Sequence, residues 1–269
     1  MFDSLFPDDT SPVVGMVHLP ALPGAPKFDG DRAAIVEAAE RDARRLAAGG
    51  VDAVMVENFG DAPFHPDDVP KHVVASMTRA TRAVVQAIDL PVGVNVLRND
   101  GEAALSVAAA AGADFVRVNV HTGARVTDQG VIEGRAHETM RLRDWLDADV
   151  AVLADHDVKH SAPIAARGFT AESVADGVER GLADAVVVSG TGTGSATDRS
   201  DLEHAVERRD ANDLDTPVLV GSGVTADTVG DLLDLADGVV VGTALKVDGD
   251  VGNPVSEERV RELVEAARE

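Results

Sequence analysis

Apolar residues along this chain occur in two alternating patterns. Short runs rich in valine are each followed by a longer, alanine-rich segment that is apolar on one face. The predicted strands cover residues 12–19, 51–58, 91–97, 114–120, 150–158, 184–190, 217–223 and 238–245. The predicted helices cover residues 31–48, 69–88, 102–111, 136–146, 170–181, 200–210, 226–235 and 256–268. Because the strand segments are apolar on both faces, they match parallel strands that helices cover.

Eight strand–helix units in a chain of 269 residues fit a single (β/α)8 TIM barrel of the α/β class. We predict one barrel domain over residues 1–269, with residues 1–11 as an N-terminal extension. A doubly wound open sheet is the alternative. No linker or change in composition indicates a second domain.

The composition excludes several kinds of site and indicates where the protein is located. The chain has no cysteine, which excludes a disulfide framework, a thiolate nucleophile and a cysteine-based metal site. No apolar run approaches the roughly 18 residues that a membrane-spanning helix needs. The N-terminus has no basic segment followed by a long apolar core, so it does not resemble a signal peptide. We therefore expect a soluble, cytoplasmic protein without membrane insertion.

The charge balance is strongly acidic. Acidic residues number 47 against 24 basic residues, which gives a formal net charge of −23. Acid spread evenly over the chain predicts an acidic surface adapted to concentrated salt, typical of a halophilic archaeal source. The alternative is an acidic patch for a basic partner, but the acidic residues are not gathered into a tail. Nucleic-acid binding is disfavoured, because contact with phosphates needs a basic surface.

Polar residues close consecutive predicted strands at the edge where barrel enzymes place their active sites. They are His18, Glu57, Asn58, Asn95, Arg98, Arg117, Asn119, His121, Asp155, His156, Asp157, Lys159 and His160. Strand alternation predicts that Arg117 and Asn119 share a face, as do Asp155, Asp157 and Lys159. Hydrogen-bonded loop histidines, capping asparagines and a structural ion-pair network are the alternatives. An apolar strand has no packing reason to end in this way, so we expect a functional pocket.

Glycine-rich loops follow the last three predicted strands. Glycine lets backbone N–H groups approach an anion closely, and the loops of strands seven and eight often bind phosphate in such barrels. The predicted phosphate-binding residues are Ser189, Gly190, Gly192, Gly221, Ser222, Gly223, Gly242 and Thr243. The alternative is that these glycines only form tight turns.

Lys159 and Lys246 are two of only four lysines in a chain that otherwise uses arginine, and their positions at strand ends suggest a chemical need. For Lys159 a Schiff base is conceivable, but a charge partner of Asp155 or Asp157, or a phosphate contact, is favoured. No cofactor is certain. A divalent metal ion is possible, with Asp155, Asp157 and Glu57 as candidate ligands, although no HExxH-type spacing occurs.

Several motifs together closely resemble the BtpA/SgcQ family of predicted barrel enzymes. They are "GMVHLPALPGAP", "VENFGDAPF", "GVNVLRND", "VRVNVHTGARVTDQG", "VKHSAP" and "VLVGSG…VVGTALKVDG". The likeness runs from about residue 12 to residue 262, and it implies the (β/α)8 barrel. The family takes its name from a role in photosystem I biogenesis in cyanobacteria, and other members resemble companions of bacterial carbohydrate-uptake genes. One departure from the family pattern, His156, puts a ligand role for that residue in doubt.

The first hypothesis is an enzyme that acts on a small phosphorylated metabolite, a sugar phosphate or a nucleoside-derived phosphate. Asp155 and Glu57 are the acid/base candidates, Lys159 and Arg117 would stabilise negative charge, and His18 completes the catalytic set. The predicted substrate-binding residues are Asn58, Asn95, Arg98, Asn119, His121 and His160. Proton abstraction beside a carbonyl fits best, and hydrolysis or glycosyl transfer fits nearly as well.

Two other functions remain open. One is a non-catalytic assembly factor for a membrane complex. The other is a flavin-binding barrel, although the chain has no tyrosine and one tryptophan for stacking. We expect a homo-oligomer, as is common among barrels of this type.

Overall fold

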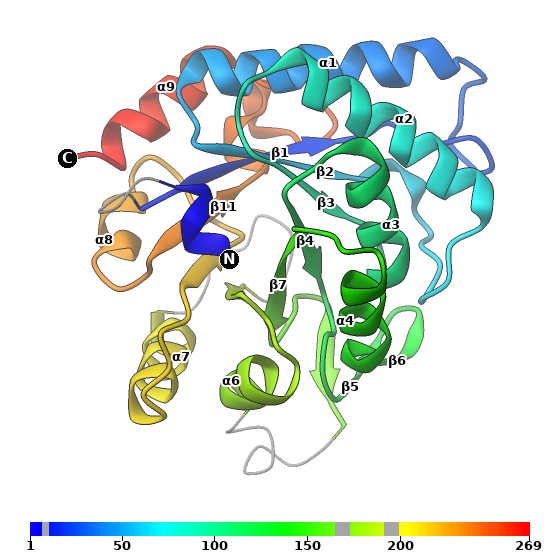
Figure 1. The fold of residues 1–269 in the computed structure, drawn as a ribbon. Helices are drawn as coiled ribbons and strands as arrows, with labels where there is room; N and C mark the ends of the chain where they lie inside the picture. Colours follow the sequence, from blue (N-terminus) through cyan, green and yellow to red (C-terminus); the bar gives the residue numbers. More distant parts are fainter. Residues whose placement is uncertain (7–10, 165–172, 191–198) are drawn as a thin grey trace.

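Eight parallel strands form a closed barrel in the computed structural model, which describes residues 1–6, 11–164, 173–190 and 199–269 (Figure 1). The strands are β1 (Val13–His18), β2 (Ala53–Glu57), β3 (Val92–Asn95), β4 (Phe115–Val118), β7 (Ala151–His156), β9 (Ala185–Ser189), β10 (Val218–Gly221) and β11 (Gly238–Val241). The first and last of them, β1 and β11, pair in parallel, with Val14 beside Val240. This pairing closes the sheet and confirms the predicted TIM barrel over the open alternative.

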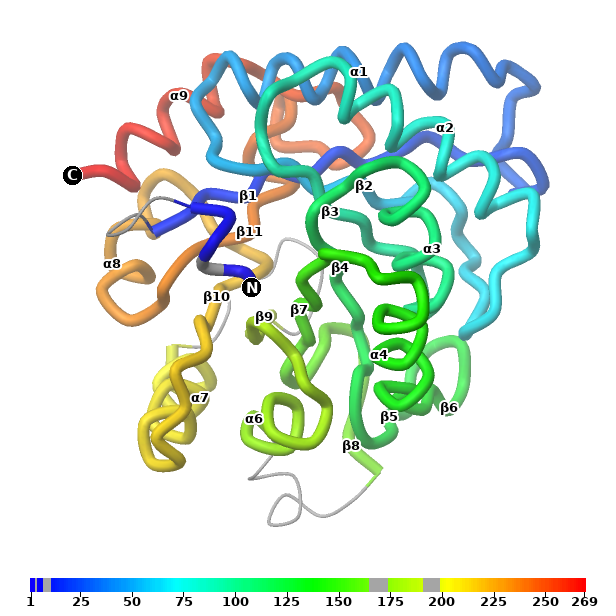
Figure 2. Tube along the Cα trace, in the orientation of Figure 1, coloured from blue at the N-terminus to red at the C-terminus, as the bar shows by residue number. Residues whose placement is uncertain are grey.

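Helices surround the strands, as the chain trace in Figure 2 shows. They are α1 (Arg32–Gly49), α2 (Lys71–Ala87), α3 (Gly101–Ala111), α4 (Ala136–Trp145), α6 (Ser173–Ala175), the π-helical turn η3 (Asp176–Arg180), α7 (Arg199–Ala211), α8 (Val229–Leu233) and α9 (Glu257–Ala266). Helix α1 shows why these boundaries arise: the Asp31 carboxylate caps its first turn, and Gly50 ends it with a φ of 95°. Within the described part of the chain, no helix is long and apolar enough to cross a membrane.

The core has two layers, one between strands and helices and one inside the barrel. Strand residues that point inward alternate with those that face the helices, so Met55 lies inside and Val56 outside. The phenyl ring of Phe2, in the short helix η1 (Phe2–Leu5), closes the N-terminal end of the interior. This ring packs edge-on against Phe115 with centroids 6.2 Å apart. Part of the predicted N-terminal extension therefore belongs to the barrel core.

A small second sheet stands beside the barrel mouth and was not predicted. Its strands are β5 (Ala124–Thr127), β6 (Gly130–Glu133) and β8 (Ser161–Pro163), all antiparallel. It buries little more than Ile132, which packs against Val120 and Val158. The rest of its side chains are polar or partly exposed, so the apolar pattern of a strand is missing from the sequence.

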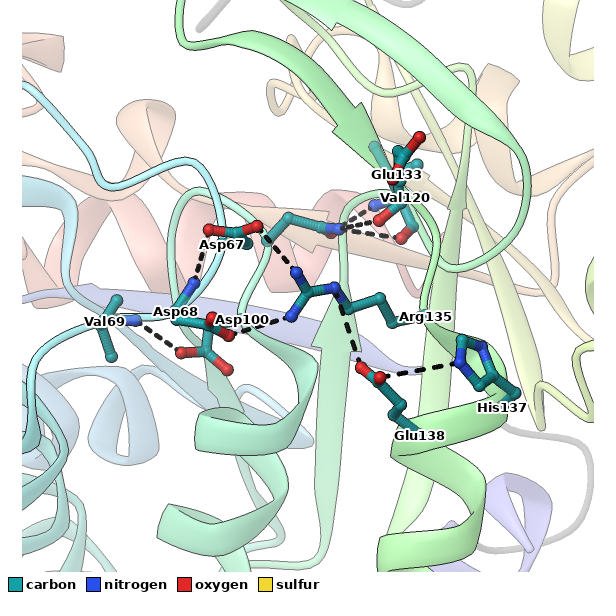
Figure 3. Close-up of polar contacts among 10 residues, drawn as sticks. Asp67, Asp68, Val69, Asp100, Val120, Glu133, Arg135, His137 and Glu138 are labelled. Atoms are coloured by element: carbon teal, nitrogen blue, oxygen red, sulfur yellow. Dashed lines mark hydrogen bonds and ion pairs between the residues drawn. The ribbon is translucent and has the colours of Figure 1, made fainter.

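Arg135 ties the loop after β2 to the start of α4 (Figure 3). Its guanidinium donates hydrogen bonds to Asp67 at 2.9 Å and to Asp68 at 3.0 Å, and it lies 3.7 Å from Glu138. In the same region the Asn99 amide donates to the backbone oxygens of Val120 and Glu133. These contacts fix the loops that surround the barrel mouth.

Candidate functional site

Each barrel strand brings one residue to the inner rim at its C-terminal end. We call these eight residues the polar ring: His18, Glu57, Asn95, Arg117, Asp155, Ser189, Gly221 and Gly242. Each lies two positions after a residue of the inner barrel layer, as His18 follows Met16. The strand register places Glu57 between His18 and Asn95. The predicted convergence of these side chains at one rim is therefore present in the fold.

Arg117 and Asp155 form a buried ion pair on one side of the polar ring. The guanidinium donates two hydrogen bonds to the carboxylate, at 2.7 and 2.9 Å, and a third to the Ser189 hydroxyl at 3.2 Å. Asn119 donates to the same carboxylate at 2.8 Å. Burial alone would lower the pKa of Arg117, but the charge of Asp155 raises it. The carboxylate, wholly buried and accepting three hydrogen bonds, is therefore occupied in fixing Arg117 and Asn119.

His18 and Glu57 meet on the opposite side of the ring, with Nε2 and Oε1 3.7 Å apart. Burial, together with the positive charges of Lys246, Lys159 and Arg117, holds the pKa of His18 well below its ordinary value. The imidazole is therefore neutral at physiological pH, and its contact with Glu57 is not an ion pair. The ring also lies 4.8 Å from that of Phe59, centroid to centroid.

A cavity of about 240 Å³ joins the polar ring to the loops after β10 and β11. His18, Glu57, Arg117 and Lys159 line one side of it. The other side is formed by residues 222–225 and 241–244, by Gly249, and by Arg259 of α9. Ser222 and Gly223 both have left-handed backbone conformations, with φ of 83° and 68°. Four of the five predicted catalytic residues, all except Asp155, thus line one space with the loops after β10 and β11, for which phosphate binding was predicted.

Arg259 was missed by the sequence reasoning. Its Nε donates to the backbone oxygen of Ala244 at 2.7 Å, which holds the guanidinium beside the loop after β11. The residue lies in a charged helix with no distinguishing motif. The position of Arg259 beside the cavity depends on the closure of the barrel, which brings α9 to this loop, and so it could not be predicted from the sequence.

Lys159 lines the same cavity from the turn after β7. Arg98 donates a hydrogen bond to the Lys159 backbone oxygen and so fixes this turn. Within the residues that the structure describes, no hydrogen bond or ion pair holds the Lys159 ammonium. Burial lowers the pKa of Lys159, as do the charges of Arg117 and Arg98, against the opposing effect of Glu57 and Asp155.

The carboxylates expected to pair with Lys159 pair with arginines instead. Asp155 binds Arg117, and Asp157 binds Arg125 of β5. Strand alternation fails at Asp157, because its φ of 53° ends the extended backbone and turns the side chain outward. The prediction that Asp155, Asp157 and Lys159 share a face is therefore wrong for Asp157.

The remaining predicted ligand-binding residues hold the rim together. Asn58 accepts a hydrogen bond from the Leu97 N–H at 2.7 Å and donates to Asp61 at 3.1 Å. The His121 ring contacts the Gly181 carbonyl oxygen at 2.8 Å. His160 lies in the turn after β7 with a φ of 57°. None of the three lines the cavity within the described part of the chain.

Asn95 does not line the cavity within the described part of the chain either, but its hydrogen bonding differs from that of these residues. Its side chain is fully buried, and neither amide atom has a hydrogen-bond partner among the described residues. It lies between Glu57 and Arg117 in the register of the sheet. An unpaired buried amide is unusual, and the substrate contact predicted for Asn95 stays a prediction.

Other predicted positions have different surroundings. Lys246 forms a buried ion pair with Asp42 of α1 at 3.1 Å, so its place at a strand end reflects packing outside the barrel. Gly190 follows β9, and Gly192 lies outside the described residues. Among the described residues no three potential ligands gather as a metal site. The suggested ligands Asp155 and Asp157 pair with arginines, and Glu57 lies against His18.

Comparison with known proteins agrees with the fold and identifies the family. Among solved structures, tryptophan synthase from Mycobacterium tuberculosis matches with a TM-score of 0.63 and 21% identity, covering 100% of this chain and 96% of the other. Phosphoribosyl anthranilate isomerase from Thermococcus kodakaraensis matches with a TM-score of 0.57 and 14% identity, covering 96% and 99%. At such identities these matches support the barrel fold alone.

Sequence relatives are much closer. The chain is 45% identical over 259 residues to the photosystem I biogenesis protein BtpA of Synechocystis, covering 96% of this chain and 88% of that protein. It is 50% identical over 261 residues to an uncharacterized protein of Thermococcus kodakarensis, covering 97% of each. The family model for BtpA matches residues 9–269. The resemblance expected from the motifs is confirmed: this chain belongs to the BtpA family.

Proposed function

We propose that this protein is an enzyme that acts on a small phosphorylated metabolite at the C-terminal mouth of the barrel. One observation carries the proposal: a single cavity is bounded by glycine-rich loops and a guanidinium at one side and by Glu57 and Lys159 at the other. A phosphate bound at the first side would present the rest of a small molecule to the second side.

The phosphate end of the cavity is supported by its donors. The loops that contain Gly223 and Gly242 allow backbone N–H groups to approach an anion without side-chain interference. Thr243 can add a hydroxyl donor, and Arg259 adds the charge. In a chain with a formal net charge of −23, positive groups directed into a cavity favour an anionic ligand.

The reacting end of the cavity suits proton transfer. Glu57 can accept a proton from carbon, and the neutral imidazole of His18 can donate a hydrogen bond to a substrate oxygen. Arg117, held rigid by Asp155, would stabilise an enolate oxygen without reorganising. We therefore propose Glu57 as the general base and Asp155 as the residue that positions Arg117.

The size of the cavity also discriminates between ligands. Pockets for drug-sized molecules and cofactors span about 300–1,000 Å³, and this cavity of about 240 Å³ is smaller. A small phosphorylated metabolite is therefore a better match than a flavin.

The binding half of the proposal is tested with Arg259→Gln. We expect inorganic phosphate and small phosphosugars, titrated by calorimetry in concentrated salt, to bind the wild type about tenfold more tightly than the variant. A charge-assisted hydrogen bond contributes roughly 1.5 kcal/mol at its lower limit, which is about a factor of ten. Arg261→Gln is the matched control, because it removes the same charge two residues away on α9, outside the cavity. Equal affinity in both variants would remove Arg259 and its loop from the phosphate site.

The proposed role of Glu57 as general base is tested with Glu57→Gln. In heavy water, NMR should detect wild-type exchange of the hydrogen beside the carbonyl of a phosphorylated aldehyde or ketone that binds. The carboxamide of the variant cannot accept that proton, so exchange should fall by 10²-fold or more, on the order of what a general base contributes. Unchanged exchange would exclude Glu57 as the base. If no phosphorylated compound binds the folded wild type, an assembly role like that in the name of the Synechocystis relative becomes the better explanation.

A further inference from the structure

We infer that Lys159 is a nucleophile that forms an imine with the carbonyl carbon of the substrate. The inference rests on the proposed function and narrows its substrate class to phosphorylated aldehydes and ketones.

The first observation is the freedom of the Lys159 amine at the cavity wall. The side chain lines the cavity together with Glu57 and Arg117. Two carboxylates that could hold it as a simple cation, Asp155 and Asp157, are already engaged by Arg117 and Arg125. The third, Glu57, lies against His18, and no hydrogen bond or ion pair joins it to Lys159 among the described residues. A lysine kept only for its charge would be expected to hold such a partner, whereas this one lines the space where a ligand would bind.

The second observation is the choice of lysine at this position. The chain uses 20 arginines and four lysines. Lys27 and Lys71 are exposed, and Lys246 is buried in its ion pair with Asp42. Lys159 is therefore the lysine that lines the cavity. A guanidinium would supply charge there equally well, but it does not become a neutral amine at physiological pH and cannot form an imine.

The third observation is that the backbone of Lys159 is held in place and that its side chain is buried near other charged groups. The Arg98 guanidinium is buried and holds the backbone oxygen of Lys159, which keeps the turn after β7 in place. Burial lowers the pKa of Lys159 and so favours the neutral amine; the charges of Glu57 and Asp155 oppose this effect, and those of Arg117 and Arg98 add to it. Glu57, on the same cavity, is available to accept or return protons.

The proposed step conserves atoms and charge. The lone pair of the neutral Lys159 Nζ attacks the carbonyl carbon, and the C=O π electrons move to the oxygen, which takes up a proton from the solvent. The nitrogen then loses a proton to Glu57, which gives a neutral carbinolamine. Protonation of its hydroxyl by the Glu57 carboxylic acid expels water and leaves a C=N⁺ iminium. Glu57, again a carboxylate, can then remove the proton on the adjacent carbon to give the enamine.

The test uses glycolaldehyde phosphate, a two-carbon phosphorylated aldehyde, with sodium cyanoborohydride as the hydride donor that reduces any imine to a stable secondary amine. Peptide mass spectrometry then measures the rate of modification at each lysine of the full chain in concentrated salt. We expect Lys159 to be modified well before Lys27 and Lys71, and inorganic phosphate to slow its modification. Lys159→Arg should lose the adduct but remain folded and still be stabilised by inorganic phosphate.

Glycolaldehyde without the phosphate separates the two proposals. Modification of Lys159 no faster than of Lys27 and Lys71, in protein that phosphate still stabilises, would refute the imine and leave the phosphate site intact. Equal modification of Lys159 by both aldehydes, unaffected by inorganic phosphate or by Arg259→Gln, would support the nucleophile and refute the phosphate site. Slow modification by both aldehydes and no stabilisation by phosphate would refute both.

Discussion

Breaking the buried ion pair of Arg117 and Asp155 should destabilise the protein much more than breaking a surface ion pair. Replacing Asp155 with Leu leaves the Arg117 guanidinium, 4% exposed, without its counter-charge. Removing one partner of a buried pair destabilises a protein by about 3–5 kcal/mol. At roughly 2–4 °C for each kcal/mol in a chain of this size, the melting temperature should fall by about 6–20 °C. Arg117→Met should have an effect of similar size, because it leaves a buried carboxylate.

The double variant tests the origin of this loss. Arg117→Met combined with Asp155→Leu removes both charges, so its loss should be smaller than the sum of the two single losses by about 1–3 kcal/mol. Urea unfolding in concentrated salt, with midpoint and slope fitted separately, measures all three variants.

A second pair in the same chain serves as the control. Arg125 and Asp157 are also an arginine and an aspartate, but the aspartate side chain is 53% exposed. Breaking that pair with Asp157→Leu should change stability by about 0–1 kcal/mol. If the single effects at Arg117 and Asp155 simply add, or if both pairs respond alike, the assignment of Asp155 as a positioning group for a buried cation is refuted.

Three further predictions concern the barrel. Gly93→Ala would place a methyl group 2.1 Å from the phenyl ring of Phe115 inside the barrel. The free energy of unfolding, measured in urea, should therefore fall by about 1–3 kcal/mol or more. Gly177→Ala is the control, because its methyl group meets nothing within 4 Å, and it should be close to neutral. Phe2→Ala should destabilise by about 3–5 kcal/mol, and an unchanged melting temperature would contradict its place in the core. The pKa of His18 and of His121 lies below 6.5 because of burial, so the unfolded chain binds more protons in acid. Unfolding free energy should therefore fall between pH 7 and 5.5, by at most about 1.4 kcal/mol per pH unit for each histidine, and His121→Asn should reduce this slope.

The sequence predicts the barrel well because parallel strands are covered on both faces. The strand expected at 184–190 forms as Ala185–Ser189, and the helix expected at 31–48 forms as Arg32–Gly49. The helix expected at 226–235 is shorter, Val229–Leu233, with turns before it. Such boundaries depend on local hydrogen bonds that periodicity does not describe.

Features without periodic burial were not predictable. The sheet of β5, β6 and β8 exposes Val126 and Val131, and its one buried anchor, Ile132, gives no alternating pattern. The burial of Phe2 depends on a contact with Phe115, more than a hundred residues away in the chain. Both features arise from tertiary contacts, which a single sequence does not reveal.

In the candidate site, too, some features could be predicted from the sequence and others could not. The face on which a side chain lies at a strand end could be predicted, because strand alternation assigns Glu57 and Arg117 to the inner face. Their partners were not, because the pairing of Arg117 with Asp155 and the approach of Arg259 depend on barrel closure. Asp157 was misassigned because a single left-handed residue ends the strand alternation.

The glycines of the polar ring have a consequence for how this family could diversify. A Cβ at Gly242 would lie 2.9 Å from His18, and one at Gly221 would lie 3.0 Å from Val187. Gly242 lines the cavity, so its missing side chain keeps room beside the His18 imidazole. A relative with a methyl group at this position would have to shift that imidazole. The residue that shapes the hollow and a proposed reacting group would therefore have to change together during evolution.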